Sequence, residues 1–203
     1  MIHPDLLQRQ EGMRRLALIT AACASIGTRL VTLCTGTCDP DYQWRRHPDN
    51  DTHVAWQTML RSMETAVQLA EAHDVILVFE PEVNNVVDSA RKARQLLDEI
   101  RSPHLKVVID GANLFHTGEL SRMQEVLNEA FDLLAGDICL AHAKDLEQDG
   151  DAGHQAAGTG VLDYEHYLRL LKDSGFDGTL VLHSLAEHQV AESLAFVRRK
   201  LGC

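Results

Sequence analysis

Short apolar runs rich in β-branched residues alternate along the chain with longer stretches whose apolar residues recur at helical spacing. Five runs have the length and composition of β-strands, namely residues 29–35 (RLVTLCT), 75–80 (VILVFE), 105–110 (LKVVID), 138–142 (ICLAH) and 179–183 (TLVLH). Helical periodicity predicts helices at about residues 11–26, 53–73, 86–101, 119–134, 164–174 and 187–201. This alternation predicts an α/β protein, with about five parallel strands and outer helices.

One long segment fits neither pattern. Residues 145–160 (DLEQDGDAGHQAAGTG) follow the fourth predicted strand and exceed the roughly 2–6 residues of an ordinary βα loop. Because loops held on a rigid scaffold often carry binding or catalytic residues, we predict that this loop is functional.

The last residues of four consecutive predicted strands are all able to bind a metal ion. They are Glu80, Asp110, His142 and His183, each about one βα unit after the one before it. Ligands of parallel α/β proteins bind at the carboxyl ends of the strands. One such residue alone is usually a hydrogen-bond partner for a loop, but four in succession favour a common site.

Side-chain alternation extends this prediction along the strands, since every second residue points to the same face. Residues of the same face as the four strand ends are Ile76, Val78, Val108, Leu140 and Val181. The residues between them, such as Leu77, Phe79, Val107 and Ile109, are expected to pack beneath the helices.

Composition narrows the class of protein. The 203 residues are 45% hydrophobic and 24% charged, and the formal net charge is −11. A hydrophobic core is therefore expected, whereas a basic surface for nucleic acid is not. The length suits one domain.

No segment resembles a membrane span or a signal peptide, because the most apolar stretch, residues 16–26, is shorter than the ~20 residues that a spanning helix needs. The five cysteines are an odd number without a C-x-x-C pair, which favours reduced thiols and a cytoplasmic protein.

Four segments together resemble the xylose-isomerase-like family of TIM-barrel sugar isomerases and epimerases. Residues 78–82 (VFEPE) resemble the segment with its first metal-binding glutamate, and residues 108–114 (VIDGANL) its D-P-A-N-L segment. Residues 142–145 (HAKD) resemble its H-x-K-D segment, and residues 158–164 (GTGVLDY) the G-x-G-x-x-D-[YF] that follows. The resemblance runs over nearly the whole chain.

The resemblance implies that residues 1–203 are a single, N-terminally truncated domain, a partial (β/α)₈ barrel that lacks about three βα units. The five predicted strands then correspond to strands four to eight of the family. Such a sheet leaves an apolar inner face and two unpaired edges, so we expect a homo-oligomer or another partner that covers the open face.

The activity implied is a metal-dependent isomerase or epimerase of a small keto sugar or sugar acid, acting by proton abstraction through an enediolate. The metal ligands would be Glu80, Asp110, His142 and His183. Mixed carboxylate and imidazole ligands favour Mn²⁺ or Zn²⁺, while Mg²⁺, Co²⁺ and Fe²⁺ stay open.

One ligand position departs from the family. His183 stands where the family usually has a second glutamate that binds metal and exchanges a proton with substrate. We expect Glu80 to act as the base on one face and His183 to exchange a proton on the other, since imidazole titrates near neutral pH. Glu187 lies four residues further on, and it suits the start of a helix better.

Five further residues are candidate substrate contacts, each with a plainer alternative. Asn113 either binds substrate hydroxyls or holds a turn, and Lys144 either binds substrate or is structural. His154, in the long loop, either faces the site or is simply exposed. Trp44 and His47 either form an apolar wall and an anion contact or belong to a surface loop.

Two other functions remain open at this stage. A catalytically degenerate barrel fragment could serve as a binding or assembly module, as the missing units and His183 suggest. A metal-dependent hydrolase resembling AP endonucleases is the third alternative, against which the net charge of −11 counts.

Overall fold

The computed structural model describes residues 1–202. Five strands form a parallel half-barrel in the order β1-β2-β3-β4-β6, which confirms the predicted fold. The strands are β1 Leu30–Cys34, β2 Ile76–Glu80, β3 Leu105–Asp110, β4 Ile138–Asp145 and β6 Thr179–Leu182. The helices are α1 Leu6–Ile26, α2 His53–Ala72, α3 Ala90–Ile100, α4 Met123–Leu134, α5 Tyr164–Asp173 and α6 Val190–Leu201.

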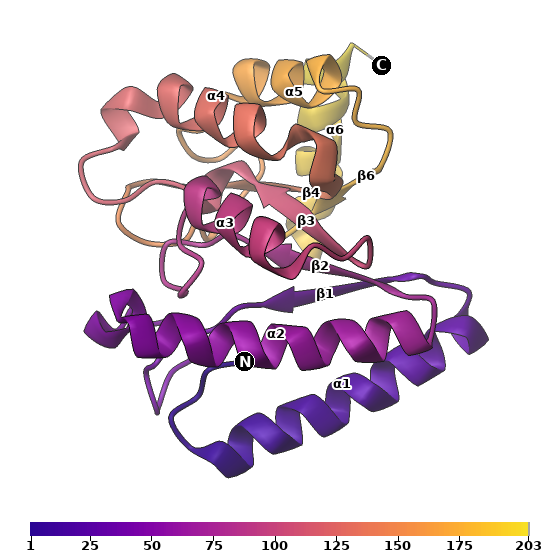
Figure 1. The fold of residues 1–203 in the computed structure, drawn as a ribbon. Helices are drawn as coiled ribbons and strands as arrows, with labels where there is room; N and C mark the ends of the chain where they lie inside the picture. The colour runs from indigo at the N-terminus through magenta and orange to yellow at the C-terminus, as the bar shows by residue number, and fades with distance from the viewer. Residues whose placement is uncertain (203) are drawn as a thin grey trace.

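The helices cover one face of the sheet in chain order. Helices α1 and α2 lie beside β1 at one end of the half-barrel, and α5 and α6 lie at the other end, near β6 (Figure 1). The N-terminus lies by the first pair of helices and the C-terminus by the last pair.

The two faces of the sheet differ as the alternation of side chains predicts. On the outer face, Leu77, Phe79 and Ile109 are fully buried in the main core beneath the helices. On the inner face, Val78, Val108 and Leu140 form a separate small cluster, with other apolar side chains only partly buried against it. The inner cluster is small because five strands form an open half-barrel and do not enclose an interior.

Helix starts differ from the prediction where a polar cap outweighs the apolar pattern. Helix α1 begins at Leu6 rather than 11, because the Asp5 carboxylate accepts a hydrogen bond from the backbone N–H of Leu7. Helix α3 begins at Ala90 rather than 86, because Ser89 caps it and residues 82–88 form a buried loop. Short 3₁₀ turns, Leu120–Arg122 and Glu187–Gln189, precede α4 and α6.

The long loop after β4 is more ordered than its composition suggests. Strand β4 continues three residues beyond His142, because β5 (Gln155–Ala156) pairs antiparallel with Lys144 and Asp145. The prediction of a strand that ends at His142 was therefore wrong. The chain turns back on itself and returns to the rim of the half-barrel.

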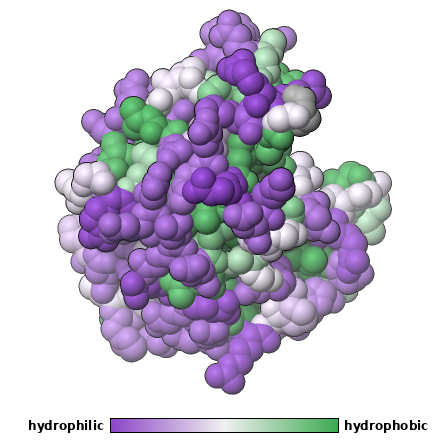
Figure 2. Space-filling model, turned by 90° about the horizontal axis from the view of Figure 1, so that it is seen from above, coloured by the Kyte–Doolittle hydropathy of each residue, from purple (hydrophilic) through white to green (hydrophobic). Residues whose placement is uncertain are grey.

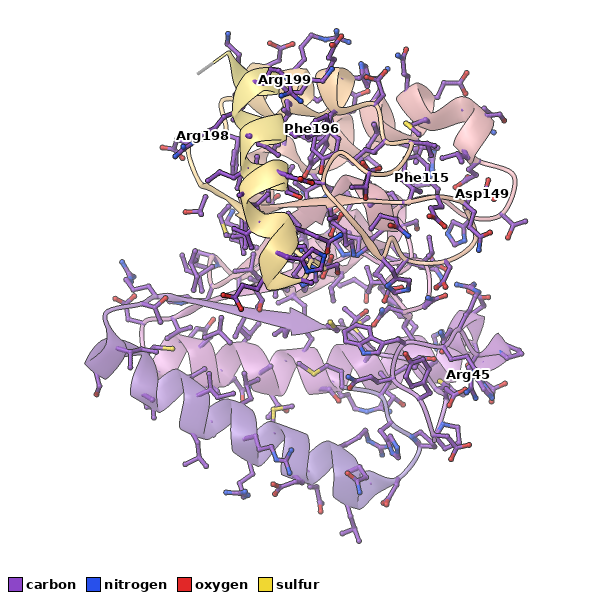
Figure 3. All side chains as sticks on the ribbon, turned by 180° about the vertical axis from the view of Figure 1, so that it is seen from behind. Arg45, Phe115, Asp149, Phe196, Arg198 and Arg199 are labelled. Carbon is purple, nitrogen blue, oxygen red and sulfur yellow. The ribbon has the colours of Figure 1, made fainter. Side chains whose placement is uncertain are left out.

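The returning loop is held in place by contacts of Asp145, Gly158 and Phe196. The Asp145 carboxylate accepts backbone hydrogen bonds from Leu146, Gly158 and Leu162, at 2.9–3.1 Å. Gly158 has a φ of 90° and lies under Phe196, whose ring a Cβ there would approach to 2.6 Å. Figure 3 shows Phe196 on α6, so the loop is packed against the last helix as well as β4.

The ends of the half-barrel are less covered than its middle. Within residues 1–202, strand β1 pairs only with β2, and β6 pairs only with β4. The terminal helices carry exposed apolar residues, which are Leu6, Leu7, Leu18, Ile19 and Ile26 on α1 and Val190, Leu194 and Leu201 on α6. On the face seen in Figure 2, hydrophilic residues cover most of the surface, and hydrophobic residues are exposed between them.

Two general expectations also bear on the described residues. Within residues 1–202, no helix combines the length and the apolar character that crossing a lipid bilayer requires. Cys23, Cys34, Cys38 and Cys139 are free thiols, and Cys203 lies outside the described residues.

Candidate functional site

The four predicted strand-end residues come from neighbouring strands at the carboxyl edge of the sheet. Glu80 and Asp110 are the last residues of β2 and β3, and Asp110 is paired in register with His142 of β4. His183 follows the last residue of β6, and its backbone N–H donates to the carbonyl of Ala143 at 3.1 Å. The parallel pairing therefore brings all four to one rim.

Their side chains lie close together. His142 Nδ1 is 3.4 Å from Glu80 Oε1 and 3.4 Å from Asp110 Oδ2. The rings of His142 and His183 stack with centroids 4.5 Å apart. Asp110, His142 and His183 each offer one ligand atom, and these three atoms lie within 4.8 Å of one another. Glu80 is not a member of that group of three, although its carboxylate faces His142 directly.

Asp110 is fully buried, and one of its oxygens is incompletely satisfied. Oδ1 accepts a hydrogen bond from the backbone N–H of Ala112, whereas Oδ2 accepts none. The cationic side chains nearest to Oδ2 are Lys144, at 3.1 Å, and His142. Burial raises the pKa of Asp110, but the charges of Lys144 and His142 outweigh it and hold the pKa below the ordinary value.

The two imidazoles are shifted in opposite directions. Burial lowers the pKa of His142, but its interactions with Asp110 and Glu80 dominate and raise it to about 9. Burial and the positive charges of His142 and Lys144 lower the pKa of His183. At neutral pH without a bound cation, His142 therefore carries the proton and His183 is neutral.

This donor set fits a divalent ion. His142 Nδ1 is 3.4 Å from both carboxylates, which is longer than the roughly 2.7–2.9 Å of a strong charged hydrogen bond. The side chains of the cluster therefore do not satisfy one another with strong hydrogen bonds. The buried Oδ2 of Asp110 has the free lone pair that a ligand needs. Carboxylate and imidazole are ligands of Zn²⁺ and Mn²⁺.

Lys144 and Asn113 lie against the cluster. Lys144 is 4% exposed, and its Nζ donates to Asn113 Oδ1 at 2.7 Å. The Asn113 Nδ2 group donates to Glu80 Oε1 at 2.6 Å. Both residues thus contact predicted metal ligands, and the substrate roles expected of them stay predictions.

A cleft of about 1170 Å³ opens above the cluster. Its lining includes five residues of the rim and two residues from loops, namely Glu80, Asn113, His142, Lys144 and His183, and Trp44 and His154. Trp44 is 41% exposed, so much of its ring is available for contact. The side chain of His154 is exposed, with Nε2 3.8 Å from Asp151 Oδ2.

His47 is not among the residues that line the cleft. Its Nδ1 accepts a hydrogen bond from the backbone N–H of Asp49 and so caps a short 3₁₀ turn. The neighbouring guanidinium groups are also engaged, with Arg45 paired to Asp39 and Arg46 to Asp51 and Asp88. In Figure 3, Arg45 lies at the end of the molecule near α2. An anion contact by His47 stays a prediction without support from this geometry.

Glu82 and Asp145 lie near the rim but were not among the predicted site residues. Glu82 is buried in the loop after β2, where burial, with some repulsion from Glu80, raises its pKa to about 7. Its carboxylate accepts hydrogen bonds from the Asn84 backbone and the Asn85 side chain. The sequence signal for Glu82 was the group of polar residues that directly follows strand β2, at positions 82, 84 and 85. Glu187 is exposed in its 3₁₀ turn and does not line the cleft.

Residues 1–200 match the family model described as xylose isomerase-like TIM barrel. The chain belongs to the xylose isomerase-like TIM-barrel family. No curated protein sequence matches it. Among solved structures, a D-tagatose 3-epimerase-like protein superposes with a TM-score of 0.76 at 14% identity, over 96% of this chain and 70% of that one.

Two other members of this fold are informative. The 3-keto-D-glucoside 4-epimerase YcjR from E. coli has a TM-score of 0.72 at 18% identity, over 98% of this chain and 73% of that one. The IOLI protein with a bound zinc atom has a TM-score of 0.72 at 16% identity, over 98% and 70% respectively. Identities this low establish the shared fold alone.

Proposed function

We propose that this xylose isomerase-like chain is a metal-dependent isomerase or epimerase of a small keto sugar or sugar acid. The observation that carries the proposal is the convergence of Asp110, His142 and His183 on one point of the rim, with Glu80 beside them. Glu80 would be the fourth ligand of the ion. The zinc bound by the IOLI protein supports a divalent ion, and Zn²⁺ or Mn²⁺ suits these ligands best.

The bound ion would polarise the carbonyl and neighbouring hydroxyl of the sugar and stabilise the enediolate left by proton removal. Glu80 removes the proton, because its carboxylate lines the cleft and is held by the Asn113 amide. His183 lies on the other side of the cluster and lines the cleft, where its imidazole would exchange a proton with substrate while its basic nitrogen is not bound to the ion. Lys144 and His154, which line the cleft, bind substrate hydroxyls, and Trp44 packs against the carbon chain.

The test is exchange of substrate hydrogen with solvent. The full chain is loaded with Zn²⁺ or Mn²⁺ and incubated in D₂O with a panel of small ketoses and hydroxypyruvate. NMR is expected to show deuterium at the carbon next to the carbonyl. A Glu80→Gln variant should lose about 10²- to 10⁴-fold of the rate, the usual contribution of a general base.

Glu187→Gln is the matched control, since Glu187 is a second carboxylate near β6 that lies outside the cleft. It should exchange at the wild-type rate. Absence of exchange by metal-loaded wild-type protein across the whole panel would overturn the proposed activity. Loss of exchange in Glu187→Gln would overturn the assignment of His183 to the position of the second glutamate.

We also propose that the open side of the half-barrel binds further polypeptide. In the part of the chain that the structure describes, strands β1 and β6 each have an unpaired edge, and the helices next to them expose apolar residues. Five strands leave room for three in an eight-stranded barrel, so a partner of three βα units fits the gap. A second five-stranded copy has too many strands to complete the same barrel.

We also propose a cytoplasmic location, which the free thiols of the described cysteines support.

A further inference from the structure

Asn113 is the side chain through which most of the rim is connected. It ends the 3₁₀ turn Gly111–Asn113 that follows β3, and it is 2% exposed. Its amide contacts three different elements. Nδ2 donates to Glu80 Oε1 at the end of β2, while Oδ1 accepts from Lys144 Nζ on β4 and from the backbone N–H of Gly153 in the long loop.

These contacts fix which way the amide points. Oδ1 accepts two hydrogen bonds, at 2.7 Å from the Lys144 ammonium and at 3.1 Å from Gly153, which uses both of its lone pairs. If the amide were flipped, its NH₂ group would face these two donors, and its oxygen would face the Glu80 carboxylate. All three contacts would then be repulsive, so only one orientation is compatible with the surroundings.

The consequence for Glu80 is a fixed carboxylate. A glutamate side chain has several rotatable bonds, and holding it in one position costs conformational entropy. The Asn113 N–H meets Oε1 at 2.6 Å, whereas His142 meets the same oxygen only at the longer distance of 3.4 Å. Among the described residues, no hydrogen bond reaches Oε2. The amide therefore secures one oxygen and leaves the other available.

The long loop also depends on this arrangement. Gly153 lies so close over the 3₁₀ turn that a Cβ would stand 2.6 Å from Ala112 Cβ and 2.5 Å from the Asp145 carbonyl oxygen. Its N–H reaches the Ala112 carbonyl and Asn113 Oδ1 at 3.1 Å each. The glycine thus brings the loop backbone onto the amide and closes the network from above.

We propose that Asn113 is a positioning residue that acts through Glu80, rather than a residue that binds substrate. With both lone pairs of Oδ1 occupied and one N–H on Glu80, a single N–H remains for any other partner. This inference rests on the proposed function, because it assumes that Glu80 takes part in a metal site. In the metal-free protein, the Asn113 amide holds the Glu80 carboxylate in the position from which it binds the ion.

The experiment compares metal affinity in matched asparagine variants of the full chain. Zn²⁺ and Mn²⁺ binding is measured by isothermal titration calorimetry for wild type, Asn113→Ala, Asn113→Leu and Asn84→Ala. Leucine fills the volume of the amide without its polar atoms. Thermal melting without metal shows whether each variant is folded, and a folded variant of either type suffices.

Asn84 provides the control because it shares the burial of Asn113 and its contact with the long loop, but bonds neither to Glu80 nor to Lys144. It is a buried asparagine, and its Nδ2 donates to Asp151 in the same long loop. If loosening of that loop were the cause of weaker binding, both alanine variants would show it. If the contact with Glu80 is the cause, only the Asn113 variants will.

We expect the Asn113 variants to bind metal about 10- to 100-fold more weakly than wild type, the usual effect of removing a partner of a metal ligand. Asn84→Ala should stay within about twofold. Equal affinity in wild type and the Asn113 variants would overturn the inference, as would an equal loss in Asn84→Ala. Failure of wild type to bind either ion would instead overturn the proposed metal site, so the two failures are distinguishable.

Discussion

The middle of the rim and its β6 edge contribute to the same cluster but are built differently. In the middle, Asp110, His142 and Lys144 lie on strands with neighbours on both sides, and all three are buried. At the edge, His183 is exposed, and its described contacts are stacking on His142 and interactions with Ser184 and the Ala143 backbone. Two kinds of site residue therefore lie within a few ångströms.

This difference separates stability from function. The buried charges in the middle are held by one another, so a change to one leaves its partners unsatisfied in the core. His183, at the edge, makes few contacts, so its replacement should change the free energy of unfolding little. The middle should consequently determine whether the rim folds, whereas the edge should affect ligand binding with little effect on folding.

The largest expected effect on stability is that of Asp110→Asn. This change removes the negative charge between buried Lys144 and His142, and breaking a buried ion pair typically costs about 3–5 kcal/mol of unfolding free energy. Urea unfolding of metal-free protein measures it. His183→Ala, at the exposed edge, should change the same quantity by no more than about 0.5 kcal/mol. Similar costs for the two variants would remove the distinction between middle and edge.

The next effect is a pH dependence that originates in the middle of the rim. The pKa of His142 is raised from 6.5 to about 9 by its carboxylate partners, so its ionisation stabilises the folded state. That stabilisation is fully present below pH 6.5 and is lost as the pH rises through about 9. At most, about 3.5 kcal/mol of unfolding free energy is at stake, on the basis of about 1.4 kcal/mol per pKa unit.

Urea unfolding of metal-free wild type and His142→Gln at pH 6, 7.5 and 9.5 measures this contribution as a difference between the two proteins. The difference is expected to shrink as the pH rises. A difference that stays constant across this range would show that His142 is not held protonated by Asp110 and Glu80.

A smaller effect is expected in the loop that covers the rim. A Cβ on Gly160 would stand 2.3 Å from the Leu146 carbonyl oxygen and 2.5 Å from Asp145 Oδ1. Gly160→Ala should therefore destabilise the protein by about 1–3 kcal/mol, as overpacking does. Gly136→Ala is the control, because nothing lies within 4 Å of its Cβ position. Equal melting temperatures for the two variants would contradict the close packing of the loop on Asp145.

Much of the fold follows from periodicity. The five parallel strands and their two faces were predicted because period-two alternation and βα spacing are local signals that the tertiary structure reinforces. Element ends were less predictable. Strand β4 runs on to Asp145 only because β5 pairs with it from ten residues further along the chain, and no local pattern in residues 143–145 announces that partner.

The candidate site divides in the same way. The convergence of Glu80, Asp110, His142 and His183 could be predicted, because strand ends of a parallel sheet meet at one edge. The contacts of Asn113 with Glu80 and Lys144 could not, because they depend on side-chain positions to within an ångström. Asn113 followed Asp110 closely enough to be noticed, but its sequence position could not show which atoms it would meet.

Anomalous X-ray diffraction from crystals of the full chain grown with Zn²⁺ tests most directly whether these strand ends bind one ion. The account predicts a single strong zinc peak on the rim, about 2.0–2.2 Å from ligand atoms of Glu80, Asp110, His142 and His183. A rim without zinc density, or an ion bound only elsewhere on the chain, would contradict it.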